Sequence, residues 1–425
     1  MATVSAARPF WKTLRTPAAG PAPRLADCHH CGTLQRVPPL SMHARLDCAV
    51  CHAALERPQG RSQAAALACA AASLVLLLPA NVLPFLTTSI AGVSRQSRLG
   101  SSASAMLADG FPELALVVGL FVVVLPLVRC ALLTAVLGAL QLRRRPRWLG
   151  RAFRAANALQ VWAMADVFLL GGVVAVARLR TVIAVELGTG ALCFAAAAVL
   201  MLLTRATLDT GAVWRAICAD RDPPDHEPVL ACAGCGLLLP VTRAGHRCPR
   251  CAARLQIRKD GAVPVPAALT LAAALLYVPA NLLPMATLPI GLASVQYTVL
   301  EGVVDLSRAG LYGLALLVLT ASFAIPLLKI AVLAWCIGSV LRRSQRRPDI
   351  KTRLVRGVDE IGRWSMVDPF VIACFVPVTQ YDVLFHSGAE PAAPLFAAVV
   401  ILTTLAARHF DSRLLWDRAL PRRPA

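Results

Sequence analysis

Apolar residues in this chain come in eight long runs separated by shorter polar segments. Each run is close to the length of about 20 residues that an α-helix needs to cross a bilayer. Alanine-rich stretches such as 191–201 also fit a soluble core helix, but regular spacing and the lack of short amphipathic segments favour membrane spans. The pattern predicts an all-α polytopic membrane protein with about eight transmembrane helices, at residues 64–90, 112–141, 158–178, 182–204, 266–290, 311–341, 364–385 and 391–409.

The chain also repeats itself at an offset of about 200 residues. LLPANVLPF (77–85) recurs as YVPANLLPM (277–285), FVVVLPLVRCA (121–131) as ASFAIPLLKIA (321–331), and WAMADVF (162–168) as WSMVDPF (364–370). We therefore expect two homologous halves, each with four membrane helices after a small cysteine module. The expected units are a flexible N-terminus (1–24), cysteine module 1 (25–60), membrane module 1 (61–215), a linker with cysteine module 2 (216–262), membrane module 2 (263–418) and a tail (419–425).

Composition agrees with a membrane protein, because 16% of the 425 residues are charged, against about 25% in soluble chains. The formal charge of +20 would also suit a nucleic-acid partner. However, arginines are concentrated in two short connections, 142–157 and 342–363, and the opposite loops hold few. Loops of that kind remain in the cytoplasm. We expect both termini and both cysteine modules to be cytoplasmic, with no nucleic-acid partner.

Eight of the 14 cysteines form two C-x2-C pairs in each half. The pairs are separated by 16 residues in the first copy and 12 in the second, and Gly32 and Gly236 follow the first pair of each. Two such turns offer four thiolates in a tetrahedron, the arrangement of a zinc ribbon. In a reducing compartment this favours metal over disulfides. We expect two Zn²⁺ ions per chain, one on each set of four: Cys28, Cys31, Cys48 and Cys51, and Cys232, Cys235, Cys248 and Cys251.

Other interpretations of the cysteines are weaker. Residues 48–52, CAVCH, match the C-x-x-C-H pattern of haem attachment, but the second copy, CPRCA (248–252), lacks the histidine. A redox role for the paired thiols remains an alternative. The neighbouring His29, His30 and His246 are not expected to be ligands, because four cysteines complete each site.

Two prolines and an asparagine recur near the end of the first run of each half. Pro79 and Pro84, like Pro279 and Pro284, are expected to bend the first span, because proline cannot donate a helical hydrogen bond. Interruptions at matching places in two repeats point to a transport site. The accompanying Asn81 and Asn281 either line a polar cavity or cap the break.

Ionisable residues within the apolar runs each cost roughly 2.5–3.5 kcal/mol, and four of them stand out. Arg129 and Lys329 lie on the second run of each half, and Asp166 and Asp368 on the third. Their similar depths predict the pairs Arg129–Asp166 and Lys329–Asp368. These are either structural ion pairs or a protonatable relay or headgroup site. Because arginine does not release its proton, any proton coupling is expected in the second half.

In combination, these motifs resemble the paraquat-inducible protein A family over about residues 25–418. The resemblance implies an inner-membrane protein of Gram-negative bacteria that works with a periplasmic MCE-domain partner, and the pair moves lipid between membranes. It further implies cytoplasmic zinc ribbons on the eight cysteines and functional polar residues in the membrane core. Those would correspond here to Lys329, Asp368, Arg129 and Asp166.

Motifs of ordinary catalysis are missing from the sequence, including the phosphate-binding loop and the H-E-x-x-H helix, so we do not expect an enzyme. The leading hypothesis is an inner-membrane subunit that passes phospholipid to or from a periplasmic MCE-domain tunnel and contributes to envelope integrity. One alternative is a non-transporting membrane anchor that recruits the MCE partner. A weaker alternative is a membrane redox protein that uses the cysteine modules.

Overall fold

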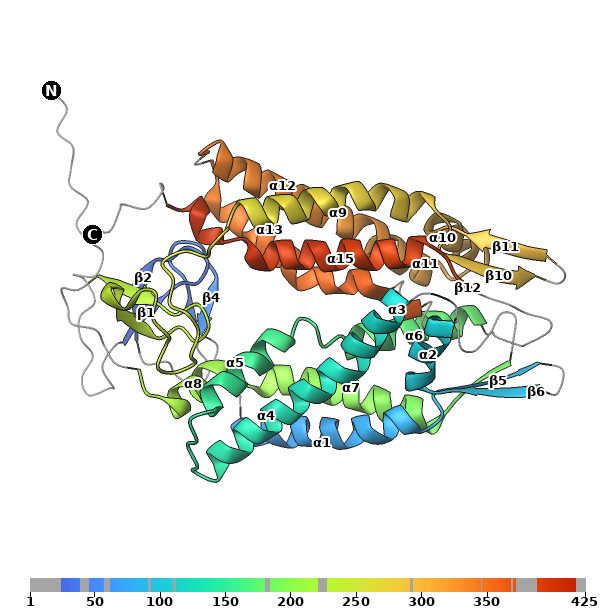
Figure 1. Cartoon of the computed structure of the whole chain (residues 1–425), viewed down its shortest axis with the longest axis horizontal. Helices are drawn as coiled ribbons and strands as arrows, with labels where there is room; N and C mark the ends of the chain where they lie inside the picture. Colours follow the sequence, from blue (N-terminus) through green and yellow to red (C-terminus); the bar gives the residue numbers. More distant parts are fainter. Residues whose placement is uncertain are drawn as a thin grey trace.

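The computed structural model describes residues 24–38, 46–56, 62–90, 93–108, 110, 112–179, 184–220, 228–290, 293–344, 346–367, 370–371 and 388–417. Within this part the molecule is elongated, with long helices running along its length (Figure 1). The cysteine modules lie at one end of the helices and small β-sheets lie at the other.

The cysteine modules consist of short antiparallel hairpins. In the first module, β1 (Arg24–Asp27) pairs with β2 (Leu34–Val37), and β3 (Leu46–Asp47) pairs with β4 (Ala54–Glu56). In the second module, β8 (Val229–Ala231) pairs with β9 (Leu238–Pro240), followed by the 3₁₀ turn η3 (Val241–Arg243).

The first membrane module begins with α1, which Ser62 caps by accepting a hydrogen bond from the Ala65 amide at 3.3 Å. A π-helical turn, η2, joins α3 to α4 in one continuous helix. The elements of this module are α1 (Gln63–Val82), β5 (Leu86–Ile90), β6 (Val93–Ser97), α2 (Leu99–Ala108), α3 (Pro112–Val118), η2 (Gly119–Val124), α4 (Leu125–Gln141), α5 (Leu149–Leu159), α6 (Ala165–Leu179), β7 (Ala184–Leu187), α7 (Thr189–Thr207) and α8 (Thr210–Ile217).

The second membrane module repeats this order, including the π-helical turn, here η4. Its elements are α9 (Pro264–Leu282), β10 (Ala286–Ile290), β11 (Ala293–Tyr297), α10 (Val299–Arg308), α11 (Tyr312–Leu319), η4 (Thr320–Ala324), α12 (Ile325–Leu341), α13 (Pro348–Ile361), η5 (Gly362–Met366), β12 (Gly388–Ala389), α15 (Ala392–His409) and η6 (Ser412–Leu415).

Six helices of the described part are long and apolar enough to cross a membrane: 63–82, 112–141, 189–207, 264–282, 312–341 and 392–409. The predicted stretch 158–178 corresponds to α6, whose apolar part, Ala165–Ala177, is shorter. Most of the predicted stretch 364–385 lies outside the described residues. The mostly helical membrane architecture is thus confirmed, while the number eight stays a prediction.

The structure corrects two sequence expectations about secondary structure. The first run of each half does not remain helical to residue 90 or 290, because α1 ends at Val82 and α9 at Leu282. The following residues form three-stranded antiparallel sheets, ordered β6-β5-β7 and β11-β10-β12. In addition, the arginine-rich connections contain the amphipathic helices α5 and α13, which carry apolar residues on their buried sides.

Within each half, the first and last long helices pack side by side, α1 on α7 and α9 on α15, with α4 and α12 beside them. The two halves meet where α3 contacts α15 and α6 contacts η5. At that interface the rings of Phe168 and Phe370 lie 5.6 Å apart. Gly171 makes this approach possible, since a Cβ there would meet the Val367 carbonyl oxygen at 3.2 Å.

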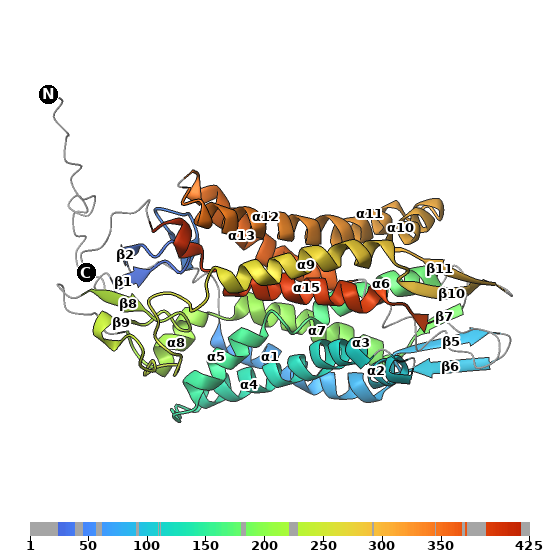
Figure 2. The same cartoon turned by 45° about the horizontal axis from the view of Figure 1, so that its top comes forward.

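The two cysteine modules are exchanged between the halves. The first module packs on α12, α13 and η6 of the second half, in an apolar cluster with Val355 and Trp416. The second module packs on α4, α5 and α8 of the first half, in a cluster with Phe153 and Trp214. Figure 2 shows the hairpins β1–β2 and β8–β9 next to each other at this end. Each membrane module is therefore covered by the cysteine module of the other half.

Specific contacts hold this exchanged arrangement together. The Ser412 hydroxyl donates to the His30 carbonyl at 3.0 Å. Between the modules, Asp220 accepts from Arg24 at 3.2 Å and from Arg250 at 2.6 Å. The Arg250 side chain is only 2% exposed, so its pair with Asp220 is well shielded from solvent on the arginine side. Asp220 thus connects both modules to each other.

Gly150 provides a test of the exchange, because α5 approaches the second module so closely that a Cβ at this position would overlap the Arg250 carbonyl oxygen. We expect Gly150→Ala to lower the free energy of unfolding by at least about 2 kcal/mol and to expose module 2 to protease. Gly357 on α13 is the control, because a Cβ there meets nothing within 4 Å, and Gly357→Ala should stabilise by up to about 1 kcal/mol. Thermal unfolding in detergent and limited proteolysis measure both; equal behaviour of the two variants would contradict the exchange.

Candidate functional site

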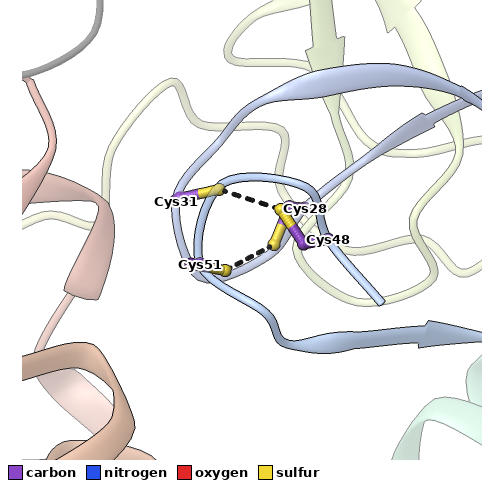
Figure 3. Close-up of side chains that lie close together, drawn as sticks. All are labelled: Cys28, Cys31, Cys48 and Cys51. Atoms are coloured by element: carbon purple, nitrogen blue, oxygen red, sulfur yellow. Dashed lines mark hydrogen bonds between the residues drawn. The ribbon is translucent and has the colours of Figure 1, made fainter. Parts of the chain in front are cut away.

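The eight predicted ligands come together in two groups of four, and each group is able to hold one metal ion. Within each group all Sγ atoms lie within 4.8 Å of one another. The Sγ atoms are 3.5 Å apart for Cys28 and Cys51 and 3.6 Å apart for Cys31 and Cys48. Figure 3 shows these four side chains gathered together. A tetrahedron with metal–sulfur bonds of about 2.3 Å has edges of about 3.8 Å. The thiols are therefore spaced as a four-thiolate metal site requires.

Backbone conformation explains why the turns place the thiols this way. In both modules, the residue after each C-x2-C pair has a positive φ, and its amide donates back to the first cysteine of the pair. Gly32 (+73°) and Gly236 (+72°) occupy this position in the first turns, as the sequence predicted. In the second turns the same conformation is adopted by His52 (+54°) and Ala252 (+56°).

Side chains around the first module support its thiols. The Gln35 amide, which the sequence analysis did not single out, donates to Cys48 Sγ at 2.9 Å. Both groups of possible metal ligands contain cysteines only. Burial, followed by the positive charge of Arg356, lowers the pKa of His30 to about 4. The imidazole of His30 is therefore neutral at physiological pH, which suits a half-buried position beside the cysteines.

The P-A-N-x-L-P motif joins the first and last helices of each half. Pro79 lies in the last turn of α1, so the motif lies where the helix ends, whereas the sequence predicted a bend in a span that continued to residue 90. The carbonyl of Pro84 accepts from the Gly190 amide at the start of α7, at 2.9 Å. In the second half, Pro284 accepts from the Ala392 amide at 3.3 Å. The prolines thus lie where one helix ends and its neighbour begins.

The asparagines of the motif bind their own helices. Asn81 donates from Nδ2 to the Leu77 carbonyl at 2.6 Å, and Asn281 donates to the Tyr277 carbonyl at 2.8 Å. In both, the buried Oδ1 atom has no hydrogen-bond partner among the described residues. A buried acceptor without a partner costs about 1–3 kcal/mol. Capping of the helix therefore explains the Nδ2 atom of each asparagine but not its Oδ1 atom. That the Oδ1 atoms line a polar cavity stays a prediction.

A π-helical turn precedes the buried cation on the second long helix of each half. The Leu125 amide bonds to the carbonyl five residues earlier, and Ile325 does the same. This wider turn comes directly before Pro126 and Pro326, which cannot donate and would clash with a carbonyl four residues earlier. Carbonyls in the turns bind other elements: Phe121 accepts from the Met164 amide at 3.2 Å, and Phe323 accepts from the Tyr277 hydroxyl at 3.0 Å.

Lys329 is 1% exposed, within a span that also carries the π-helical turn. It lies 12 residues before the end of α12 at Leu341, which is about 18 Å of helix rise. Its Nζ donates to the Thr404 hydroxyl on α15 at 3.0 Å. A Cβ at Gly362 of η5 would meet Lys329 Nζ at 2.5 Å, so this glycine leaves room for the ammonium. The predicted partner, Asp368, lies outside the described residues.

The corresponding region of the first half contains a buried ion pair. Asp166 Oδ2 accepts from Arg205 Nη1 on α7 at 3.3 Å, and the two side chains are 7% and 13% exposed. Arg205 also donates to the carbonyls of Gln160 and Ala163 at 3.0 and 3.3 Å. Arg129 is 1% exposed, and its predicted contact with Asp166 stays a prediction. The sequence analysis missed Arg205 because it follows the predicted span, which ended at residue 204.

Comparison with known proteins identifies the family of this chain. The sequence profile named "Paraquat-inducible protein A" matches residues 63–218 and again 265–419, which is most of the chain. The chain belongs to the paraquat-inducible protein A family. The two matched segments correspond to the two membrane modules, and both cysteine modules lie outside them.

Two of the relatives that the chain matches are named as intermembrane transport proteins, and a third as a tunnel protein. The chain is 28% identical to the Escherichia coli "Intermembrane transport protein PqiA" over 92% of its own length and 95% of the relative. It is 32% identical to the E. coli "Lipophilic envelope-spanning tunnel protein A", over 61% and 60% of the two chains. A "Probable intermembrane transport protein" of Haemophilus influenzae is 25% identical over 95% and 98%. No solved structure matches the chain.

Metal removal tests the cysteine groups of this family member. Because each group has four thiolates, we expect Cys28→Ser and Cys232→Ser each to lose about one of two bound ions. Since the first module covers the second half, Cys28→Ser should increase hydrogen exchange in α12 and α13, not in α4 and α5. Elemental analysis and hydrogen-exchange mass spectrometry measure these effects. A purified chain with no bound metal and a visible redox chromophore would support the redox alternative instead.

The Arg205–Asp166 pair makes a separate prediction about stability. Arg205→Ala removes a guanidinium from a buried carboxylate, and we expect a loss of about 3 kcal/mol in the free energy of unfolding. Arg308 offers the control, because its pair with Asp305 is exposed (78% and 46%), so Arg308→Ala should cost less than about 1 kcal/mol. Thermal unfolding of both variants checks this. Equal losses in the free energy of unfolding would show that the buried pair stabilises the fold no more than the exposed pair does.

Proposed function

We propose that this protein is a multi-pass inner-membrane subunit of an intermembrane transport system, and that it moves phospholipid to or from a periplasmic MCE-domain tunnel. The names of its relatives support a role in intermembrane transport. The observation that carries the finer proposal is the fully buried Lys329 on a membrane-spanning helix, held by a hydroxyl and given room by a glycine. A cation kept in an apolar layer at such cost usually serves a substrate or ion pathway.

Three elements that contact α12, the helix of Lys329, carry buried hydroxyl groups: η4, η5 and α15. Ser322 of η4 and Ser365 of η5 are buried, and their hydroxyl oxygens have no hydrogen-bond partner among the described residues. The elements η4 and η5 contact each other, and both contact α12, which carries Lys329. Thr404 belongs to α15. We propose that these hydroxyls and Lys329, with Asp368, receive the headgroup of a lipid.

The first half supplies the counterpart of this region, with Arg129 at the position of Lys329 and the Arg205–Asp166 pair between α7 and α6. An arginine at this position keeps its proton. We propose a mainly structural role for the first half and a proton-coupled or headgroup role for the second. The motif residues Pro79, Pro84, Pro279 and Pro284, with Asn81 and Asn281, shape the helix ends that border this interior.

We further propose that the cysteine modules each hold one Zn²⁺ and face the cytoplasm. Four thiolates at the observed spacing suit zinc, and arginine-rich connections lie at the same end as the modules. The two three-stranded sheets lie at the opposite end. We propose that a periplasmic partner binds these sheets. A non-transporting anchor would bind its partner at the same surface.

Neutralising Lys329 separates the transporter from the anchor. Lys329→Met keeps the apolar stem and removes a buried charge, so we expect the chain to fold and to bind its partner while phospholipid exchange falls to the level of a strain lacking the chain. Thr404→Val should show a smaller loss. Transfer of pulse-labelled phospholipid between fractionated membranes measures transport, and co-purification measures partner binding.

The neighbouring Leu328 is the matched control, because it is 49% exposed and Leu328→Met should change neither measurement. Normal lipid exchange in Lys329→Met would support the anchor. Loss of folding together with both activities would instead give Lys329 a structural role.

A further inference from the structure

A groove that no part of the proposed transport path uses lies at the cysteine-module end of α12. It has a volume of about 530 Å³ and lies between the last turns of α12 and the start of α13. One wall is apolar and belongs to a membrane-spanning helix, with Trp335 and Gly338 as its main residues. The other wall carries Arg342, Arg346 and Lys351. We call it the Lys351 groove.

Lys351 lines this groove as a buried residue without an acidic partner among the described residues. It is 3% exposed, and its Nζ donates to the Ser339 hydroxyl. The same Nζ lies 5.6 Å from the centre of the Trp335 ring, a cation–π distance. Neither contact neutralises the charge, and none of the ion pairs found in the described part involves Lys351. A buried ammonium of this kind calls for an anion.

The arginines around the groove add positive charge, so they also favour an anionic ligand. Arg342 and Arg346 are exposed at its rim, and Arg343 takes a left-handed φ of +54° at the end of α12, where glycine is preferred. These arginines also lie at the C-terminal end of α12, where the negative end of the helix dipole favours positive charge. Four cationic side chains, Arg342, Arg346, Arg347 and Lys351, therefore line the groove together with the Trp335 ring, and its lining includes no carboxylate.

The apolar wall of the groove favours an anion that also carries an apolar part. Trp335 is 49% exposed on a helix of membrane-spanning length, and tryptophan prefers the boundary between lipid and water. A Cβ at Gly338 would meet nothing within 4 Å, so the helix surface is open there. A free phosphate ion would use the cations and leave this wall bare. A phospholipid uses both parts, because its phosphate and its acyl chain are joined.

We propose that the Lys351 groove binds the headgroup of an anionic phospholipid, with an acyl chain along the Trp335–Gly338 surface. Gly338 follows Lys329 by nine residues on α12, which is about 14 Å of helix rise. The groove is therefore separate from the Lys329 region, and its occupation does not depend on the proposed transport.

The first half contains a built-in comparison. A groove of about 720 Å³ lies at the corresponding end of α4, lined by Gly138, Arg144, Arg145 and Trp148 among others. However, alanines stand at the positions of Trp335 and Ser339, Ala135 and Ala139, and the residue 202 positions before Lys351 is the buried Leu149. This groove has surface arginines but no buried cation, so it should not select anionic headgroups in the same way.

Lipid binding to the full-length protein in detergent tests the proposal, with native mass spectrometry as the readout. We expect dioleoylphosphatidylglycerol to bind about tenfold more tightly than dioleoylphosphatidylcholine, the effect of about one charge-assisted hydrogen bond. Lys351→Met should remove this preference without lowering the unfolding temperature, because a buried charge without a counter-charge does not stabilise the fold. Arg145→Gln in the first groove should retain the preference.

Gly338→Leu is the second variant, because it keeps every charge and fills the open helix surface with a side chain that has room. It should weaken phosphatidylglycerol binding even if Lys351→Met fails to fold. Equal affinity for the two lipids in the wild type would overturn the proposal, and so would unchanged binding in Gly338→Leu. Competition by inorganic phosphate as effective as that by phosphatidylglycerol would make this a phosphate site and contradict lipid recognition.

Discussion

Inside an apolar layer, a backbone carbonyl or amide that loses its helical partner has no water to replace it, so it must be satisfied by protein. The prolines of this chain illustrate that constraint. Before Pro126 and Pro326 the helix widens to a π-helical turn, and carbonyls of those turns bind an amide and a tyrosine hydroxyl from other elements. At the end of the first spans, the carbonyls of Pro84 and Pro284 accept hydrogen bonds from amides at the start of α7 and α15. Each irregular turn thereby fixes the position of a neighbouring element.

The exchange of cysteine modules connects the two halves in a second way. Among the described residues, the main contacts between the membrane helices of the two halves are those of α3 with α15 and of α6 with η5. Because each module covers the other half, the ions that we propose for the modules would stabilise the assembly of both halves as well as two small hairpin units. Asp220, between Arg24 and Arg250, adds a polar link between the modules.

Hydropathy and spacing were sufficient to predict the long helices and both groups of cysteines, because bilayer thickness and tetrahedral coordination impose regular patterns on a sequence. The same signals could not separate the strand at Leu86–Ile90 from the helix before it, since a short apolar run fits either structure. The exchange of modules depends on packing between distant residues such as Gly150 and Arg250, which no local pattern records. Arg205 was missed because it lies one residue beyond a predicted span, and Lys351 because it lies in an arginine-rich connection, where basic residues are common.

The differences between the halves all point in one direction. Lys329 faces a hydroxyl on Thr404, whereas the first half has Arg129 and, 202 positions before Thr404, Leu202. Lys351 and Ser339 likewise correspond to Leu149 and Ala139. A lysine ammonium holds three rotatable donors and shifts its protonation more readily than a guanidinium, which agrees with the ligand-binding role that we propose for the second half. The first half instead contains the buried ion pair of Arg205 and Asp166, in which each side chain holds the other in place. Duplication would then have given one half that holds the structure and one that is free to recognise a substrate.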